Sequence, residues 1–331
     1  MTGASGFIAL HCVRELLERG YRVRGTVRDL LAEAALRRAL LPLEPGERLS
    51  FARAELLSDD GWAEALAGAR YVLHVASPLP KAVPKDENEL IRPAREGALR
   101  VLRFARAEGV QRVVLTSSMA AVSSGRRRDQ GHVFDENDWA DLSQPVPPYE
   151  KSKTLAERAA WDYVRGEGRP LELVAMNPVF VLGPSLTGTD NASNEIVGKL
   201  VRREMPGIPR LHLPVVDVRD VATAHVLAMT QANAAGQRYI LASETAWMKD
   251  IADTLAAAGY RVPTRVVPDF VARVAALFDP TVRLVVPRLG KLSLVTSEKA
   301  RRELGWSGRS MREMVLDTAQ HFRARRAKAR D

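Results

Sequence analysis

The chain is poor in cysteine, in aromatic residues and in long apolar segments. Cys12 is the single cysteine among 331 residues, which excludes an internal disulfide and is typical of a protein of the reducing cytoplasm. No run of about 18 apolar residues and no charged-then-apolar leader occurs, so we expect neither a membrane span nor a signal peptide. Aromatic residues make up 6% of the chain, and the basic residues behind its formal charge of +9 are not interleaved with them. We therefore expect no nucleic-acid partner.

A strand is also missing at the start, where a glycine-rich turn stands instead. Residues 2–9 read TGASGFIA, the TGxxGxxA spacing of a dinucleotide-binding turn between a strand and a helix. Gly3 and Gly6 let the backbone turn tightly and approach a pyrophosphate, whose charge the N-terminus of the following helix stabilises. Because the strand before such a turn is central and buried, we expect the natural start to lie a few residues upstream and to supply it.

Strands and helices alternate along the first 180 residues. Alternation and β-branched content predict strands at 21–27, 49–53, 71–75, 112–115 and 171–176, with helices at 60–66, 87–108 and 149–165. This order predicts an α/β fold with a doubly wound parallel sheet covered on both faces. We expect a Rossmann-type domain and a smaller substrate lobe, divided as residues 1–180 with 212–243, and residues 181–211 with 244–331.

Tyr149 and Lys153 carry the first candidate chemistry. They lie four residues apart in a predicted helix, so their side chains share one face. An ammonium beside a phenol favours the phenolate, so we expect Lys153 to lower the pKa of Tyr149 from about 10 toward neutrality. Tyr149 would then serve as an acid and base. Taken alone, the pair is equally typical of a surface tyrosine beside a solvated lysine.

Ser117 and Ser118 follow the predicted strand 112–115, at the carboxyl edge where a doubly wound sheet binds ligands. A hydroxyl there can hydrogen-bond a carbonyl oxygen and hold it for protonation by Tyr149. A serine after a strand is also a common capping residue. The combination is more specific, because the phosphate-binding turn, the serine and the tyrosine–lysine helix occur in the order that one hydride-transfer architecture requires.

These features occur within longer segments by which the chain resembles the extended short-chain dehydrogenase/reductases. The resemblance is to their branch of dihydroflavonol reductases, cinnamoyl-CoA reductases and microbial aldehyde or ketone reductases. The segments span nearly the whole chain: TGASGFIA, TVRD at 26–29, VLHVASP at 72–78, VVLTSS at 113–118, YEKSKTLAE at 149–157, NPVFVLGP at 177–184, VDVRDVATAH at 216–225 and SEKARRELGW at 297–306. It implies reversible NADPH-dependent reduction of a small carbonyl compound, with Tyr149 donating the proton. Lys153 would lower its pKa and hold the nicotinamide ribose, and Ser118 would hold the carbonyl oxygen.

The resemblance also implies the residues around cofactor and substrate. The cofactor would contact Thr2, Gly3, Ser5, Gly6, Phe7, Ile8, Arg28, Glu55, Leu56, Val75, Ala76, Ser77, Tyr149, Lys153, Pro178 and Val179. The substrate would contact Ser77, Ser118, Ser123, Tyr149 and Phe180. Ser123 replaces an asparagine that in plant members contacts a hydroxylated aromatic substrate, which argues against a flavonoid. Glu96 replaces a common asparagine, which argues against a proton relay there.

The end of the strand at 21–27 selects the cofactor. An acidic residue there would bind the ribose 2′-hydroxyl of NAD, whereas an arginine accommodates the 2′-phosphate of NADP. The chain has Arg28 followed at once by Asp29, so the position alone leaves the choice open. The match to TVRD favours NADP(H) over NAD(H).

Two other functions fit parts of the sequence. A nucleotide-sugar epimerase or dehydratase with tightly held NAD would use the same scaffold, and Lys199, Arg202 and Arg203 could bind its diphosphate. Such an enzyme would consume no net cofactor. A redox sensor that binds dinucleotide without turnover is the non-catalytic alternative, but such proteins usually lose the tyrosine–lysine pair.

Other polar residues are expected to be structural. His74 and His225 lie in apolar segments and are predicted to be packing residues, and no spacing typical of metal ligands is present. Asp217, Arg219 and Asp220 are predicted to form ion pairs and caps. The resemblance allows a monomer or a homodimer.

Overall fold

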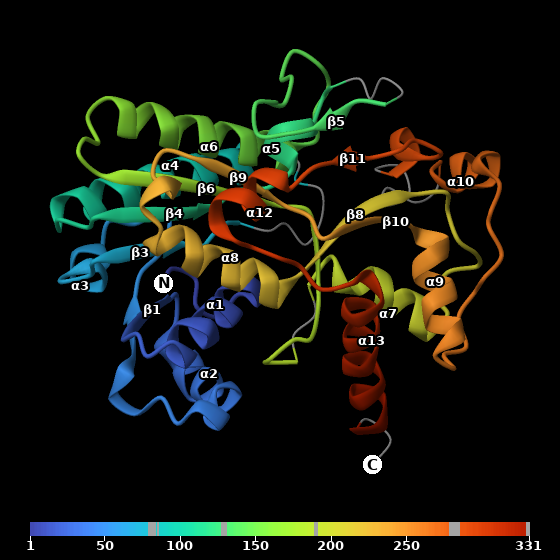
Figure 1. The fold of residues 1–331 in the computed structure, drawn as a ribbon, viewed down its shortest axis with the longest axis horizontal. Coiled ribbons are helices and arrows are strands. Elements are labelled where there is room, and N and C mark those ends of the chain that lie inside the picture. The colour runs from blue at the N-terminus through green and yellow to red at the C-terminus, as the bar shows by residue number, and fades with distance from the viewer. Residues whose placement is uncertain (79–83, 85, 127–130, 189–190, 278–284, 329–331) are drawn as a thin grey trace.

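The computed structural model describes residues 1–78, 84, 86–126, 131–188, 191–277 and 285–328 (Figure 1). The strands are β1 Val23–Val27, β2 Leu49–Arg53, β3 Tyr71–His74, β4 Arg112–Thr116, β5 Val133–Phe134, β6 Glu172–Pro178, β7 Phe180–Leu182, β8 His212–Asp217, β9 Arg238–Leu241, β10 Glu244–Trp247 and β11 Leu294–Val295. The α-helices are α1 Phe7–Glu18, α2 Glu33–Ala39, α3 Trp62–Leu66, α4 Asn88–Ala107, α5 Ala120–Ser123, α6 Pro148–Arg165, α7 Asn194–Arg202, α8 Val218–Thr230, α9 Met248–Ala257, α10 Asp269–Ala275, α12 Glu298–Leu304 and α13 Met311–Lys328. None of the helices in these ranges is both long and apolar enough to cross a membrane.

The main sheet is parallel and has the strand order β3-β4-β6-β9. All five residues of β4 are buried, as expected for a central strand with helices on both faces. In Figure 1, α4 and α6 lie on one side of this sheet, and α1 and α8 lie on the other. The predicted α/β class with a parallel sheet is confirmed.

The first residues of the chain lie between β1 and β3. Thr2 forms a single parallel bridge with His74. On the other side, the carbonyl of Met1 accepts a hydrogen bond from the Thr26 N–H at 2.8 Å, and the Ala4 N–H donates to the Thr26 carbonyl at 2.9 Å. These few residues lie where a strand between β1 and β3 would lie without forming one, and they join the β1–β2 pair to the main sheet.

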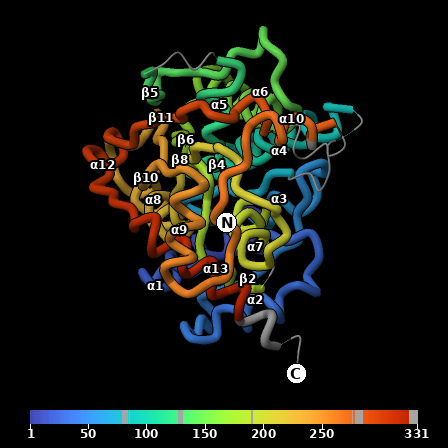
Figure 2. The backbone as a smooth tube through the Cα atoms, turned by 90° about the vertical axis from the view of Figure 1, so that its right-hand side faces the viewer, coloured from blue at the N-terminus to red at the C-terminus, as the bar shows by residue number. Residues whose placement is uncertain are grey.

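A second sheet, which we did not predict, has the order β10-β8-β7, with β8 parallel to β7 and antiparallel to β10. Its apolar face packs with helices α7, α9 and α13 around a core of its own, the region that faces the viewer in Figure 2. The core side chains include Leu182, Val197, Leu213, Leu255 and Val315. Short strands and Pro214 within β8 gave this sheet a weak signal in the sequence.

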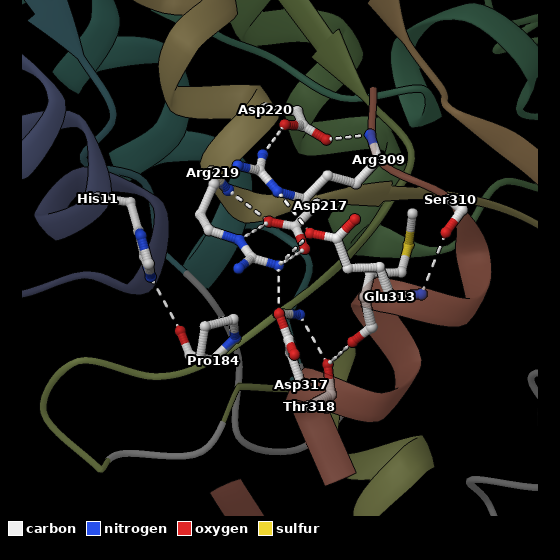
Figure 3. A network of polar contacts seen from close by, with 12 residues as sticks. His11, Pro184, Asp217, Arg219, Asp220, Arg309, Ser310, Glu313, Asp317 and Thr318 are labelled. Carbon is white, nitrogen blue, oxygen red and sulfur yellow. Dashed lines mark hydrogen bonds and ion pairs between the residues drawn. The ribbon is translucent and has the colours of Figure 1, made fainter. Parts of the chain in front are cut away.

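An ionic network joins α13 to the start of α8 (Figure 3). The Asp217 carboxylate accepts from the Arg219 N–H at 2.8 Å and so caps α8. It also accepts from the Arg219 guanidinium at 2.8 and 2.7 Å. Arg219 reaches Asp317 of α13 at 2.7 Å, while Asp220 pairs with Arg309. The structure thus gives these residues the structural role that we predicted.

Two of the buried histidines have hydrogen-bond partners inside the fold. The Nδ1 atom of His74 lies 2.8 Å from the Thr2 hydroxyl. His225 has its Nε2 atom 2.7 Å from the Thr116 hydroxyl and its Nδ1 atom 2.7 Å from the Val221 carbonyl. Among the described residues, no group of three or more acidic, histidine or cysteine side chains could hold a metal ion.

The three buried histidines His11, His74 and His225 predict that the protein loses stability in acid. Burial lowers the pKa of His11 to about 4, of His74 to about 3 and of His225 to about 4. In the unfolded chain they titrate near 6.5, so the unfolded state binds more protons between about pH 6.5 and 4. The free energy of unfolding should fall with decreasing pH in that window, by up to about 1.4 kcal/mol per pH unit for each histidine. Urea unfolding at a series of pH values measures it, and His225→Gln should flatten the slope by one histidine's share. An unchanged slope in that variant would contradict the assignment.

Candidate active site

The glycine-rich turn is packed against the segment that follows β3. Gly3 has φ +64°, and a Cβ atom at Gly3 would lie 3.0 Å from the Cα atom of Ala76. Gly6 caps α1 in an extended conformation, and no described side chain caps that helix end. Ser5 and Gly6 are exposed, while Phe7 and Ile8 are half-buried. The first N–H groups of α1 are thus suited to an anion.

Thr2 holds this turn to the segment after β3. Its buried hydroxyl accepts hydrogen bonds from the N–H groups of Val75 at 3.1 Å and Ala76 at 3.0 Å. Ala76 and Ser77 line a cavity of about 20 Å³ next to Lys153. The Thr2 side chain therefore faces the protein, and it contributes to a cofactor site by placing its neighbours.

The residues at the end of β1 differ in their partners. The Asp29 carboxylate accepts a hydrogen bond from the Leu31 N–H at 2.9 Å, capping a 3-10 turn at Leu30–Ala32. Arg28 is exposed and forms no hydrogen bond or ion pair with any described residue. Of the two, the arginine is the side chain available to a ligand, which fits a 2′-phosphate.

Glu55 and Leu56 follow β2, and their backbone is fixed by neighbouring elements. The Glu55 carbonyl accepts from the Trp62 indole at 2.9 Å, and the Leu56 carbonyl accepts from Arg100. A Cβ atom at Gly97 of α4 would lie 2.9 Å from Leu56, so glycine permits this close contact. These two predicted cofactor contacts are thus held between α3 and α4.

Ser118 and Tyr149 are brought together by β4 and α6. Pro148 begins α6, a position where proline's missing N–H costs nothing, and this places Tyr149 in the first turn. The Ser118 hydroxyl hydrogen-bonds the Tyr149 phenol. Burial raises the pKa of Tyr149 above 10, the Ser118 hydrogen bond lowers it, and the charge of Glu150 raises it. The expected lowering by Lys153 is therefore wrong for this structure, because desolvation dominates.

Lys153 lies buried one helical turn further along α6. Its Nζ atom donates to the Thr116 carbonyl at 3.3 Å. Burial lowers the pKa of Lys153 to about 8, and the nearby charge of Glu157 raises it. An ammonium that loses its proton near neutrality is well placed to bind a polar ligand group or to exchange a proton.

The remaining predicted residues lie at the same edge of the sheet. The Pro178 carbonyl, at the end of β6, accepts from the Met119 N–H at 3.0 Å, and Val179 links β6 to β7. Ser123 ends α5, where its hydroxyl donates to the Met119 carbonyl at 3.4 Å. Phe180 begins β7 and is half-buried.

Two other residues named from the sequence, Glu96 and Arg202, form ion pairs within the protein. Glu96 pairs with Arg92 on the exposed side of α4, 3.1 Å away. Arg202 pairs with both Glu195 and Glu204. A guanidinium neutralised by two carboxylates is a poor diphosphate ligand, which weakens the epimerase alternative.

The sequence interpretation missed the roles of two buried polar residues beneath the site, Glu157 and Asn177. Ser117 and Glu157 are hydrogen-bonded to each other, and the Asn177 amide donates to Glu157 at 2.8 Å. Spacing could have found Glu157, because it lies four residues after Lys153 on one helix face. Asn177 carries no comparable local signal, since only the pairing of β6 with β4 brings it beside Ser117.

Comparison with known proteins gives a family match over most of the chain. The model of the NAD dependent epimerase/dehydratase family matches residues 1–242. Cinnamoyl-CoA reductase 1 of Arabidopsis thaliana is 39% identical over 271 residues, covering 80% of this chain and 76% of that protein. An anthocyanidin reductase ((2S)-flavan-3-ol-forming) of Vitis vinifera is 32% identical over 343 residues, covering 98% of this chain and 95% of that protein.

Solved structures agree with these sequence matches. The yeast methylglyoxal/isovaleraldehyde reductase Gre2, in complex with NADPH, aligns with a TM-score of 0.83 at 29% identity and covers 98% of both chains. MoeE5 in complex with UDP-glucose and NAD has a TM-score of 0.73 at 22% identity, which shows a shared fold alone. The resemblance inferred from the sequence is confirmed. The chain belongs to the NAD dependent epimerase/dehydratase family, and its Rossmann-type fold is that of the reductases in that family.

Proposed function

We propose that the protein is an NADPH-dependent reductase that converts an aldehyde or ketone reversibly to an alcohol. The observation that carries this proposal is the Ser118–Tyr149 hydrogen bond, with buried Lys153 one turn away, at the sheet edge beside the glycine-rich turn. Reductases among the relatives, including Gre2 bound to NADPH, support it. Isovaleraldehyde and methylglyoxal, named for Gre2, are the first substrates to test.

The residues present fit the cofactor. Gly3 and the N-terminal end of α1 form a cradle that a Cβ atom would fill, and Arg28 offers a guanidinium to the 2′-phosphate. Val75 to Ser77 would line the opposite side of the cradle. When bound, NADPH supplies the hydride that the carbonyl carbon receives.

The side chains of the site would supply the proton and orient the substrate. With its pKa raised by burial, the Tyr149 phenol is protonated at neutral pH and can donate a proton to the carbonyl oxygen. The Ser118 hydroxyl is hydrogen-bonded to that phenol, and we expect it to hydrogen-bond the same substrate oxygen. Lys153 would place a positive charge near the phenolate that forms, and would hold the nicotinamide ribose.

The wider assignments form part of the proposal. Residues 1–180 with 212–243 would hold the cofactor, and residues 181–211 with 244–331 would shape the substrate pocket. We infer a cytoplasmic location, with which the free, buried Cys12 is consistent. We expect the protein to be a monomer or a homodimer. Net NADPH oxidation separates this proposal from an epimerase, which consumes no cofactor.

Removing the phenolic hydroxyl tests the proton donor. Tyr149→Phe should lower kcat for reduction of the carbonyl substrate by at least about 100-fold, because general acid catalysis is lost. The Kd for NADPH should stay within about twofold, since the phenol acts chiefly in the transition state. Steady-state kinetics and fluorescence titration with NADPH provide the two readouts. Activity retained within a few-fold would remove Tyr149 from the mechanism.

Arg28→Ala tests cofactor selection. Loss of a charged contact to the 2′-phosphate should weaken NADPH binding by roughly 10–100-fold, while NADH binding changes little. Arg22→Ala, which removes an exposed arginine just before β1, is the matched control. Equal weakening of both cofactors by Arg28→Ala would refute the assignment.

The pKa of Lys153 predicts an alkaline limit. Below about pH 8 the ammonium is charged, and above it the charge is lost. The kcat/KM for NADPH in the reductive direction, which reports groups of the free enzyme, should therefore decline about tenfold per unit above pH 8. Lys153→Arg should abolish this limb, because the guanidinium stays charged. A profile flat to pH 10 in the unmodified protein would contradict the role.

A further inference from the structure

Glu157 is a fully buried carboxylate that the reductase chemistry above does not use. It lies on α6, one helical turn after Lys153, with no exposed surface. One carboxylate oxygen accepts from Arg238 at 2.6 Å and from the Trp161 indole at 3.3 Å. The other accepts from the Ser117 hydroxyl and, at 2.8 Å, from the Asn177 amide. Each oxygen thus has two donors.

Arg238 accounts for only one of these four contacts. Besides Glu157, its guanidinium donates to the carbonyls of Glu136 and Asp138 at 2.9 Å each, and it stacks 3.7 Å from the centre of the Trp139 ring. A buried ion pair of this kind contributes little net stability compared with apolar side chains of similar volume. Charge pairing therefore leaves unexplained why a second carboxylate oxygen is directed at β4 and β6.

That second oxygen holds the backbone that carries Ser118. Ser117, directly before it, donates its hydroxyl to Glu157. The Asn177 amide donates both to Glu157 and, at 3.1 Å, to the Ser118 carbonyl. The carboxylate thus holds the turn after β4 directly at Ser117 and, through the Asn177 amide, at Ser118. The position of this turn decides where the Ser118 hydroxyl meets Tyr149.

Glu157 also faces Lys153: it lies four residues along the same helix, and its charge acts on the lysine. Both line the cavity of about 20 Å³, which has room for one water molecule. From the other elements, the cavity receives His74 of β3, whose pKa burial lowers, the polar Thr116 of β4, and two alanines of α4. No other carboxylate lines it. On the far side of Glu157 lie Arg238 of β9, Asn177 of β6 and Trp161 of α6.

We propose that Glu157 is a positioning residue of the reductase: its carboxylate fixes the Ser117–Ser118 turn and places a negative charge beside Lys153 in the shared cavity. The proposal rests on the proposed function for its catalytic consequence. Its electrostatic half concerns the protein alone and is measurable without turnover.

Two variants separate this role from the partnership with Arg238. Glu157→Gln leaves the Arg238 guanidinium buried without its carboxylate, and is expected to lower the unfolding midpoint. The double variant Glu157→Gln/Arg238→Met removes both charges and should recover much of that loss. If Glu157 also positions the active site, the double variant should regain stability but not activity. Its kcat should stay at least about 10-fold below that of the unmodified protein. Its KM for NADPH should change no more than about twofold.

The pH dependence gives the decisive readout. Without the carboxylate, the alkaline limb of kcat/KM for NADPH should move to lower pH by roughly one unit in the double variant. NMR titration of protein labelled with ¹³Cε,¹⁵Nζ-lysine should show the same displacement for Lys153, assigned by its absence in Lys153→Arg. Asp162→Asn, which removes an exposed carboxylate from the same helix, should leave the titration and the kinetics unchanged.

The outcomes are distinct. A double variant with the kcat, pH profile and Lys153 titration of the unmodified protein would overturn the proposal, because Glu157 would then serve only to pair with Arg238. If the unmodified protein reduces neither isovaleraldehyde nor methylglyoxal, the proposed function is in question while the lysine titration still decides the electrostatic claim. A displaced titration supports that claim, and an unchanged one refutes it.

Discussion

The rest of the structure depends on the buried hydroxyl of Thr2. Thr2 bridges to His74 of the main sheet, and its neighbours Met1 and Ala4 bond to Thr26 of the β1–β2 pair. The same hydroxyl accepts the N–H groups of Val75 and Ala76, against which Gly3 packs. The backbone of Met1, Thr2 and Ala4 therefore connects the two parallel sheets, and the Thr2 hydroxyl shapes the cradle between them. The residues expected to hold the cofactor are thus also residues that hold the domain together.

A second theme is the use of fully buried polar groups to fix backbone at the sheet edge. Glu157, Asn177 and Ser117 form a layer below the site, in which the carboxylate receives four donors. The four donors offset much of the cost of burying this carboxylate, and so many bonds to one group allow few alternative arrangements. The reacting groups above it are less constrained: Tyr149 and Ser118 touch each other, and Lys153 has one carbonyl partner. A rigid polar layer below more loosely held reacting side chains suits a site that must receive both a cofactor and a substrate.

Much of the fold was predictable because its signals are local. The predicted strand at 49–53 coincides with β2, and the predicted helix at 149–165 differs from α6 by one residue. The β10-β8-β7 sheet was not predictable, because its strands come from distant segments and acquire their pairing only in the folded chain. In the site, the spacing of Tyr149 and Lys153 was enough to place them on one face. The sign of the tyrosine's pKa shift was not predictable, since it depends on burial by elements far away in sequence.

The cap formed by Asp29 has a consequence for how the cofactor preference could evolve. In relatives of this fold an acidic side chain at this strand end selects NAD. This chain possesses one, but its carboxylate holds the Leu31 N–H at the start of a 3-10 turn. Replacing Arg28 would therefore weaken the preference for NADP(H) without creating a preference for NAD(H). A change from NADP(H) to NAD(H) would also require a new conformation of the turn between β1 and α2. We therefore expect no single substitution to reverse the preference.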